Sequence, residues 1–182
     1  MNPRPANSLA ALPLALLLGA CATAPATPAG RDALQASADE ALRRLVADQP
    51  ALGSYFLPAA HAYAVFPEVA KGAWVVGGSY GRGVVYRGGV PIGNADVSGA
   101  SVGFQWGGQA YTELLVFESE AALRRFIESG LSATVDVSAV VLKTGAAASL
   151  RYVDGVAVFV KPIGGAMVEA ALGAQQFTFQ PR

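Results

Sequence analysis

One glycine-rich stretch, from Ala62 to Gly89, constrains the fold of this 182-residue chain more than any other part. Between its glycines stand mostly Val, Ala, Tyr, Trp and Phe. β-Branched and aromatic residues favour strands, whereas glycines within strands mark turns, bulges and places where another backbone approaches closely. The stretch therefore predicts successive β-strands.

Within this stretch, the pattern predicts one strand followed by a hairpin. The first strand is expected over Tyr63 to Phe66, and a turn over Pro67 to Gly72. The hairpin strands are expected over Ala73 to Tyr80 and Val84 to Arg87, with the bend at Gly81-Arg82-Gly83.

Gly78 is expected to share one face of this hairpin with Trp74 and Tyr80, because alternate residues of a strand point the same way. Glycines leave such a face nearly bare, so another sheet, a helix or a ligand must approach it closely. Backbone packing is the structural interpretation, and a ligand groove is the functional one.

The rest of the chain predicts an α+β fold. Its composition is 53% hydrophobic and 14% charged, with 21 glycines, which suits one domain with a β-rich core. Helices are expected over Arg31 to Asp48, within Tyr55 to Ala62 and over Ser119 to Ser129. We expect a strongly curved antiparallel sheet, either open or barrel-like, with an N-terminal helix and one inserted helix. Its further strands are expected over residues 91–97, 99–118, 134–142, 147–153, 156–160, 165–172 and 175–179.

The first residues have the composition of a targeting segment. Residues 1–20 combine Arg4 with an apolar run from Leu9 to Leu18, a pattern typical of a signal peptide and short for a membrane span. The segment Leu18-Gly19-Ala20-Cys21 looks like a bacterial lipobox, so Cys21 is the expected lipid-attachment residue.

The residues after Cys21 are expected to form a lipidated, flexible tether over 21–30, because they are small residues interrupted by prolines. Residues 31–182 then form the domain. By analogy with Gram-negative sorting, Ala22 after the cysteine favours an outer-membrane lipoprotein that faces the periplasm.

Several short motifs recur in a fixed order along the domain. By their order and spacing the chain resembles the SYLF-domain family, over roughly Arg31 to Phe179. The resemblance implies a lipid-binding domain and carries over one basic position, Lys71. The motifs are Ala64-Val65-Phe66-Pro67, Lys71-Gly72, Gly77-Gly78, Tyr80-Gly81-x-Gly83 and Gly103-x-Gln105-x-Gly107-Gly108-Gln109.

For eukaryotic members, the resemblance implies phosphoinositide binding by an N-terminal amphipathic helix, and also actin binding. Here the helix over Arg31 to Asp48 carries three arginines against three aspartates and one glutamate, so it lacks a basic face. This departure favours a structural helix. Actin binding does not fit a periplasmic protein and is not transferred.

Basic and aromatic residues stand side by side in the glycine-rich stretch, where the basic ones are expected at turns. Cations next to interfacial aromatic rings suit a surface that meets lipid headgroups, although solvated turn residues have the same pattern. The candidate lipid-binding residues are Lys71, Trp74, Tyr80, Arg82, Tyr86 and Arg87.

Catalytic and metal-binding patterns are weak. Two G-x-S-x-G matches surround Ser79 and Ser101, but the only histidine, His61, precedes both, against the chain order of α/β-hydrolases. A P-loop is excluded because no Gly-Lys pair occurs. One histidine and one lipidated cysteine do not supply the usual zinc ligands. We therefore expect no enzyme activity, no cofactor and no metal.

The function favoured by these observations is a non-enzymatic phospholipid-binding module anchored to the bacterial envelope. The formal net charge of zero gives no support to nucleic-acid binding. An envelope scaffold that binds a protein partner or peptidoglycan is the main alternative, and a serine hydrolase is the third. The sequence does not identify a protein partner.

Overall fold

The computed structural model describes residues 25, 27–73, 76–102, 109–129, 132–133, 140–141, 152–163 and 174–182. Its helical elements are α1 (Pro28–Asp48), the π-helical turn η1 (Leu52–Phe56), α2 (Leu57–Ala59) and α3 (Glu120–Ser129). Its strands are β1 (Ala62–Ala73), β2 (Val76–Arg87), β3 (Val90–Val102), β4 (Gln109–Phe117), β5 (Ser132–Ala133), β6 (Val140–Val141), β7 (Val156–Ile163) and β8 (Ala174–Pro181).

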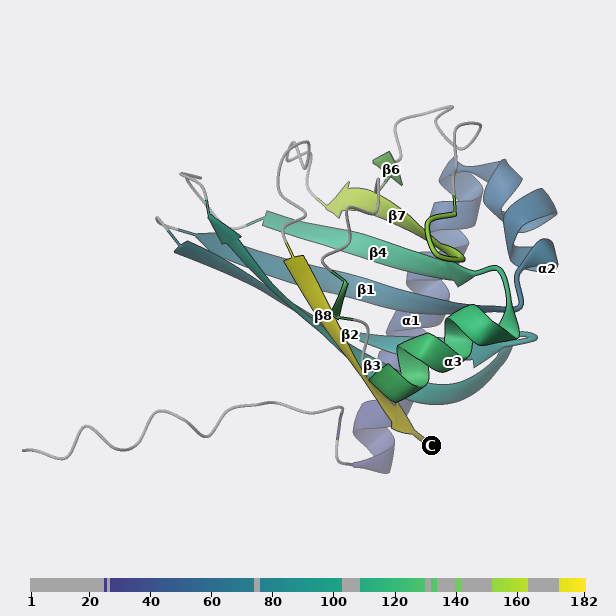
Figure 1. The fold of residues 1–182 in the computed structure, drawn as a ribbon, viewed down its shortest axis with the longest axis horizontal. Coiled ribbons are helices and arrows are strands. Elements are labelled where there is room, and N and C mark those ends of the chain that lie inside the picture. Colours follow the sequence, from purple (N-terminus) through teal and green to yellow (C-terminus); the bar gives the residue numbers. More distant parts are fainter. Residues whose placement is uncertain are drawn as a thin grey trace, which may run out of the picture.

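The strands form one twisted sheet in the order β5-β8-β3-β2-β1-β4-β7-β6 (Figure 1). Neighbouring strands are antiparallel, except that β6 runs parallel to β7. The short strands β5 and β6 lie at opposite edges, so the sheet formed by the described residues is open and not closed into a barrel. The expected α+β class with an N-terminal helix is confirmed, whereas the barrel-like form considered for the sheet is not found in its described strands.

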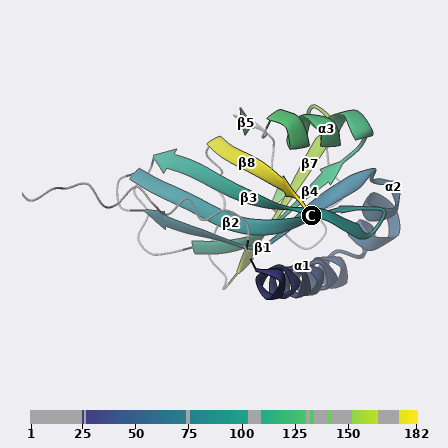
Figure 2. The same ribbon diagram turned by 90° about the horizontal axis from the view of Figure 1, so that it is seen from below.

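Helices cover both faces of the sheet, with α1 on one side and α3 on the other (Figure 2). On the α1 side, Leu45 and Leu52 pack against buried strand residues such as Phe159. On the α3 side, the ring centroids of Phe117 and Phe126 lie 5.0 Å apart, and Phe126 also contacts Phe177. Side chains alternate between the two faces along each strand, so both faces of the sheet are apolar where a helix covers them.

The two long helices begin at side-chain caps. Thr27 Oγ1 accepts a hydrogen bond from the Gly30 amide at 3.1 Å, and Pro28 follows as the first helical residue of α1. Ser119 Oγ accepts from the Ala122 amide at 3.3 Å at the start of α3. These two expected helices are confirmed, and α1 begins three residues earlier than the apolar pattern predicts. The short helix expected within Tyr55 to Ala62 is present as α2, which directly follows η1.

The turn expected over Pro67 to Gly72 is wrong, because β1 continues through these residues. The register of β1 with β4 shifts between Phe66 and Val69, which is a β-bulge. A bulge accommodates proline, which cannot donate to the ladder. Thr112 Oγ1 donates a hydrogen bond to the Pro67 carbonyl oxygen at 3.0 Å, so this displaced carbonyl keeps a partner.

The bend expected at Gly81-Arg82-Gly83 is also wrong, because β2 is continuous. The hairpin turns instead at Gly88 and Gly89, whose φ angles of +57° and +79° favour glycine. Gly81 and Gly83 are needed for close packing: a Cβ on Gly83 would lie 2.6 Å from the Val65 carbonyl oxygen.

The close approach expected at Gly78 is not found among the described residues. A Cβ on this exposed glycine would lie 3.7 Å from the Gly99 carbonyl oxygen, an ordinary contact distance. The tightest glycine outside β2 is Gly93 in β3, where a Cβ would lie 2.3 Å from the Phe179 ring.

Some of the expected strands are confirmed, and others lie partly or wholly outside the described residues. Those over 91–97, 156–160 and 175–179 are confirmed within β3, β7 and β8. Most of 134–142 and 147–153, and all of 165–172, lie outside the described residues. The turn at Asp154-Gly155 is present, with φ of 51° and 76° between the bridged residues Val153 and Val156.

Candidate functional site

A groove lies in the angle between α1 and the sheet face that α1 covers. Its volume is about 790 Å³. One wall is α1, and the floor is formed by the four adjacent strands β2, β1, β4 and β7. The residues that line it are Leu34, Ser37, Glu40, Ala41, Arg44, Leu45, Pro67, Glu68, Ala70, Tyr80, Gly81, Arg82, Thr112, Lys161, Pro162 and Ile163.

The direction of α1 sets the direction of the groove. Asp39 accepts a hydrogen bond from Tyr86 of β2, whereas Asp48, nine residues further along α1, pairs with Lys161 of β7. Nine helical residues span about 14 Å, and the three strand spacings from β2 to β7 also span about 14 Å. The helix therefore crosses the strands, and the groove runs beside it from β2 to β7.

The groove is lined by apolar side chains together with charged ones, which include Glu40 and Glu68. Leu34, Ala41 and Leu45 contribute the apolar side of α1. Two large side chains stand partly open to solvent at its ends: Tyr80 on β2 is 40% exposed, and Ile163 on β7 is 43% exposed. Partly exposed apolar side chains beside charged groups are the arrangement of an amphiphile-binding site.

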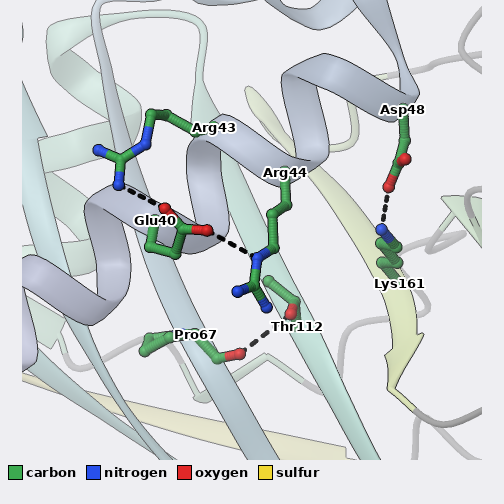
Figure 3. Close-up of polar contacts among 7 residues, drawn as sticks. All are labelled: Glu40, Arg43, Arg44, Asp48, Pro67, Thr112 and Lys161. Carbon is green, nitrogen blue, oxygen red and sulfur yellow. Dashed lines mark hydrogen bonds and ion pairs between the residues drawn. The ribbon is translucent and has the colours of Figure 1, made fainter.

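Ion pairs hold two of the cations that line the groove (Figure 3). Arg44 Nε lies 2.8 Å from Glu40 Oε1, and Arg43 contacts the other oxygen of the same carboxylate. Hydrogen bonds from these two arginines lower the pKa of Glu40. Lys161 is paired with Asp48 near the end of α1.

The third cation, Arg82, is held by an aromatic neighbour. Its Nε donates a hydrogen bond to the Tyr80 phenol oxygen at 2.8 Å, and its guanidinium carbon lies 5.8 Å from the Tyr80 ring centroid. The Tyr80 hydroxyl in turn donates to Asp96 Oδ1 at 3.3 Å. The ion pair between Arg82 and Asp96 is long, at 4.0 Å. The Tyr80 phenol thus orients the Arg82 guanidinium, and Asp96 neutralises the charge of this guanidinium only weakly.

Of the six candidate lipid-binding residues, the structure brings Tyr80 and Arg82 together in the groove. Arg82 lies within β2 and not at a turn, and Lys71 lies within β1. The side chain of Lys71, and all of Trp74 and Cys21, lie outside the described residues.

Arg87 does not join the other basic positions. It ends β2 beside the turn, opposite Ala62, whereas Lys71 lies opposite Ser79. Ser79 and Arg87 are eight residues apart along β2, which corresponds to about 26 Å. The three basic residues therefore do not form one cluster.

Tyr86 is a structural residue. It is only 3% exposed, and its ring stacks on Tyr63 with the centroids 5.0 Å apart. Its hydroxyl donates to Asp39 Oδ1 at 2.7 Å. Burial, followed by the hydrogen bond to Asp39, raises the pKa of this phenol. It helps to fix α1 on the sheet and is not accessible to a headgroup.

A second polar cluster lies inside the α3-side core. Glu113 is fully buried, and Gln175 Nε2 donates to its Oε2 at 3.1 Å and to the Tyr111 phenol oxygen at 3.2 Å. Glu113 Oε1 has no hydrogen-bond partner among the described residues. Burial raises the pKa of Glu113 to about 8, although the hydrogen bond from Gln175 opposes this shift. The carboxyl group is therefore largely neutral at pH 7.

Sequence reasoning missed Arg44, Glu68, Thr112 and Lys161 as groove residues. The Glu40–Arg44 pair was visible as an i,i+4 spacing, but nothing in the spacing says which strands lie beside it. Only the crossing of α1 over β7 brings Lys161 next to this helix. These residues come together through tertiary packing, which no local pattern encodes.

The structure does not bring Ser79 close to His61, which a serine hydrolase with these two residues would need. Ser79 lies near the start of β2, and His61 directly precedes β1, whose first residue, Ala62, pairs with Arg87 at the other end of β2. The two side chains are thus separated by most of the length of β2. Among the described residues, no group of three His, Cys, Asp or Glu side chains could hold a metal ion. None of the described helices is both long and apolar enough to cross a membrane.

The chain is similar to a curated protein at low identity. No protein-family model matches the chain. Over 148 residues the chain is 29% identical to Beta cell expansion factor A of Aeromonas veronii. The match covers 81% of this chain and 56% of that protein, so the chain spans little more than half the length of its relative. The resemblance to the SYLF family therefore rests on the sequence motifs.

Proposed function

We propose that this chain is a lipid-binding module of the SYLF type, anchored to the bacterial envelope. The observation that carries the proposal is the groove beside α1, where apolar side chains lie next to the basic residues Arg82, Arg44 and Lys161. Apolar contact favours acyl chains, and basic side chains favour phosphate or carboxylate groups. Phospholipids combine both features in one molecule.

Apolar contact in the groove would supply part of the affinity for a lipid. Each methylene group removed from water contributes about 0.8 kcal/mol. Ten buried methylenes would contribute about 8 kcal/mol, from which the cost of immobilising the lipid must be subtracted. Micromolar binding corresponds to about 8 kcal/mol of net free energy, so the charged rim must supply part of the affinity.

The proposed anchor is the acyl modification of Cys21, at the outer membrane and facing the periplasm. A tether that ends where α1 begins, at Pro28 instead of the expected residue 31, would leave the groove within reach of the membrane surface. Because one acyl chain alone binds membranes reversibly, the several chains of a bacterial lipoprotein are needed for stable attachment. No catalytic step is part of the proposal.

The test uses the chain from residue 21 with Cys21→Ser, which cannot be acylated. Its sedimentation with phosphatidylglycerol and phosphatidylethanolamine vesicles is measured, and lipid extracted from the purified protein is identified by mass spectrometry. We expect vesicle binding or a co-purified lipid. If neither vesicle binding nor a co-purified lipid is found for any lipid offered, lipid binding is contradicted and the scaffold alternative is favoured. A pull-down on peptidoglycan then tests that alternative.

A further inference from the structure

The length of the groove matches one acyl chain. Its wall on α1 runs from Leu34 to Leu45, eleven residues that span about 16 Å. The hydrocarbon core of a bilayer is about 30 Å thick, so an extended chain in one leaflet covers about 15 Å. A chain laid along α1 would therefore reach from Tyr80 on β2 to Ile163 on β7.

The volume of the groove suits one chain. A methylene group occupies about as much space as a water molecule in the liquid, about 30 Å³. The groove volume of about 790 Å³ thus holds about 26 such groups. One chain of about 16 carbons with a small headgroup fits this volume, whereas two such chains exceed it before a headgroup is added.

Arg82 marks the end of the groove where an anionic group fits best. Its contacts with Tyr80 involve Nε and the ring, which hold the guanidinium plane in place. A fixed guanidinium recognises phosphate or carboxylate with paired donors. Its ion pair with Asp96 is long, at 4.0 Å, although Glu68 lies opposite Arg82 on β1 and also lines the groove.

The other two cations are less suited to this role. Arg44 is hydrogen-bonded to Glu40 at 2.8 Å, and Lys161 is in direct contact with Asp48. An anion at either position would first have to displace a close carboxylate. Ile163 and Pro162 lie at the Lys161 end, where they suit the apolar tail of the chain.

We infer that the groove binds one molecule of a single-chain lipid, a fatty acid or a lysophospholipid, with its anionic group at Arg82 and its chain along α1 toward Ile163. This inference deepens the proposed function and rests on it. It assigns the bound species as a single-chain lipid, and not as a diacyl lipid held at a bilayer surface.

The test offers single-chain lipids to the Cys21→Ser chain that begins at residue 21. Oleate, lysophosphatidylglycerol and lysophosphatidylcholine are each added below their micelle concentration, and bound molecules are counted by native mass spectrometry. Oleate and lysophosphatidylglycerol separate a free fatty acid from a lysophospholipid as the source of the anionic group. We expect one bound molecule per chain for at least one of these two anionic lipids.

Two matched tryptophan variants locate the binding site. Ala70 is exposed on the groove floor, so Ala70→Trp fills the groove without entering the core. Ala47 is exposed on α1 and does not line the groove, so Ala47→Trp is its control. Ala70→Trp should abolish the bound species and Ala47→Trp should leave it unchanged. Equal binding by the two variants would overturn the groove as the site.

A charge variant tests the headgroup position. Arg82→Gln should weaken binding of the preferred anionic lipid about tenfold, because a hydrogen bond to a charged group is lost. It should change lysophosphatidylcholine binding less. An unchanged affinity for the anionic lipids would overturn the assignment of Arg82.

The proposed function and this inference fail in different ways. Binding to diacyl vesicles without any bound single-chain lipid would overturn the inference and leave the proposed function standing. The absence of binding to vesicles and to single-chain lipids alike would overturn both.

Discussion

The Tyr86 hydroxyl on β2 donates a hydrogen bond to Asp39 Oδ1 on α1 at 2.7 Å, across 47 residues of sequence. This contact fixes the helix over the strand at one end of the groove, while the pair of Asp48 with Lys161 fixes it over β7. The two contacts together hold the wall of the groove at a set position above its floor.

Tyr86→Phe should therefore lower the free energy of unfolding by about 1–2 kcal/mol, because the hydrogen bond to a carboxylate is lost while the ring still packs. Denaturant unfolding followed by circular dichroism measures this change. Tyr55→Phe is the matched control, because Tyr55 is 69% exposed and should shift stability by less than about 0.5 kcal/mol. Equal stabilities for the two variants would contradict a structural role for the Tyr86 hydroxyl.

The glycines of β2 should differ in their tolerance of a methyl group. Gly83→Ala places a Cβ 2.6 Å from the Val65 carbonyl oxygen and 2.7 Å from the Phe66 ring, so it should destabilise the fold by about 1–3 kcal/mol. Gly78→Ala meets only an ordinary 3.7 Å contact and should be neutral or slightly stabilising. A comparison of the two unfolding midpoints checks this. A larger loss at Gly78 would show that this exposed strand surface is packed after all.

Glu113 should make stability depend on pH. The pKa of its carboxyl group is raised to about 8 in the folded chain, against an ordinary value of 4.5. Between these values the folded chain holds a proton that the unfolded chain has released, so stability falls as pH rises, by at most about 1.4 kcal/mol per pH unit. The contribution is complete below about pH 4.5 and is lost through about pH 8.

Glu113→Gln isolates this contribution, because its amide keeps the size of the neutral acid and cannot ionise. The stability of the variant relative to the native chain should rise between pH 5 and pH 8, in denaturant unfolding at each pH. A difference that stays constant over this range would contradict a neutral, buried Glu113.

Cys21→Ser should release the chain from membranes, because the proposed acyl anchor is then absent. Expression of both forms in a Gram-negative host, followed by fractionation in high salt, measures the distribution. The native form should stay with the outer membrane. Retention of the variant in that fraction would show that Cys21 is not the main anchor.

Much of the fold follows from local sequence signals. The apolar spacing of Leu34, Leu42 and Leu45 predicts α1, and the cap at Ser119 predicts the start of α3. The turn and bend within the glycine-rich stretch were wrong for a tertiary reason. Pro67 sits at a bulge, and Gly83 lies where the next strand comes too close for a side chain.

The candidate site was predictable only in part. Tyr80 and Arg82 are two residues apart, so their contact follows from the alternation of a strand. Tyr86 points to the same face of the sheet as Tyr80 and Arg82, yet α1 covers it. The sequence contains no signal for where this helix crosses the sheet. Lys161 joins the groove for the same tertiary reason.

The central claim is that lipid binds in the groove beside α1, and a blocking label tests it most directly. In the Cys21→Ser chain, Ser37→Cys places a single thiol on the exposed groove wall, and Ser54→Cys places one on η1, outside the lining. Each is coupled to a bulky maleimide, and lipid binding is measured before and after coupling. The account predicts that the label at position 37 abolishes binding and the label at position 54 leaves it intact. Undiminished binding with position 37 fully labelled would contradict it.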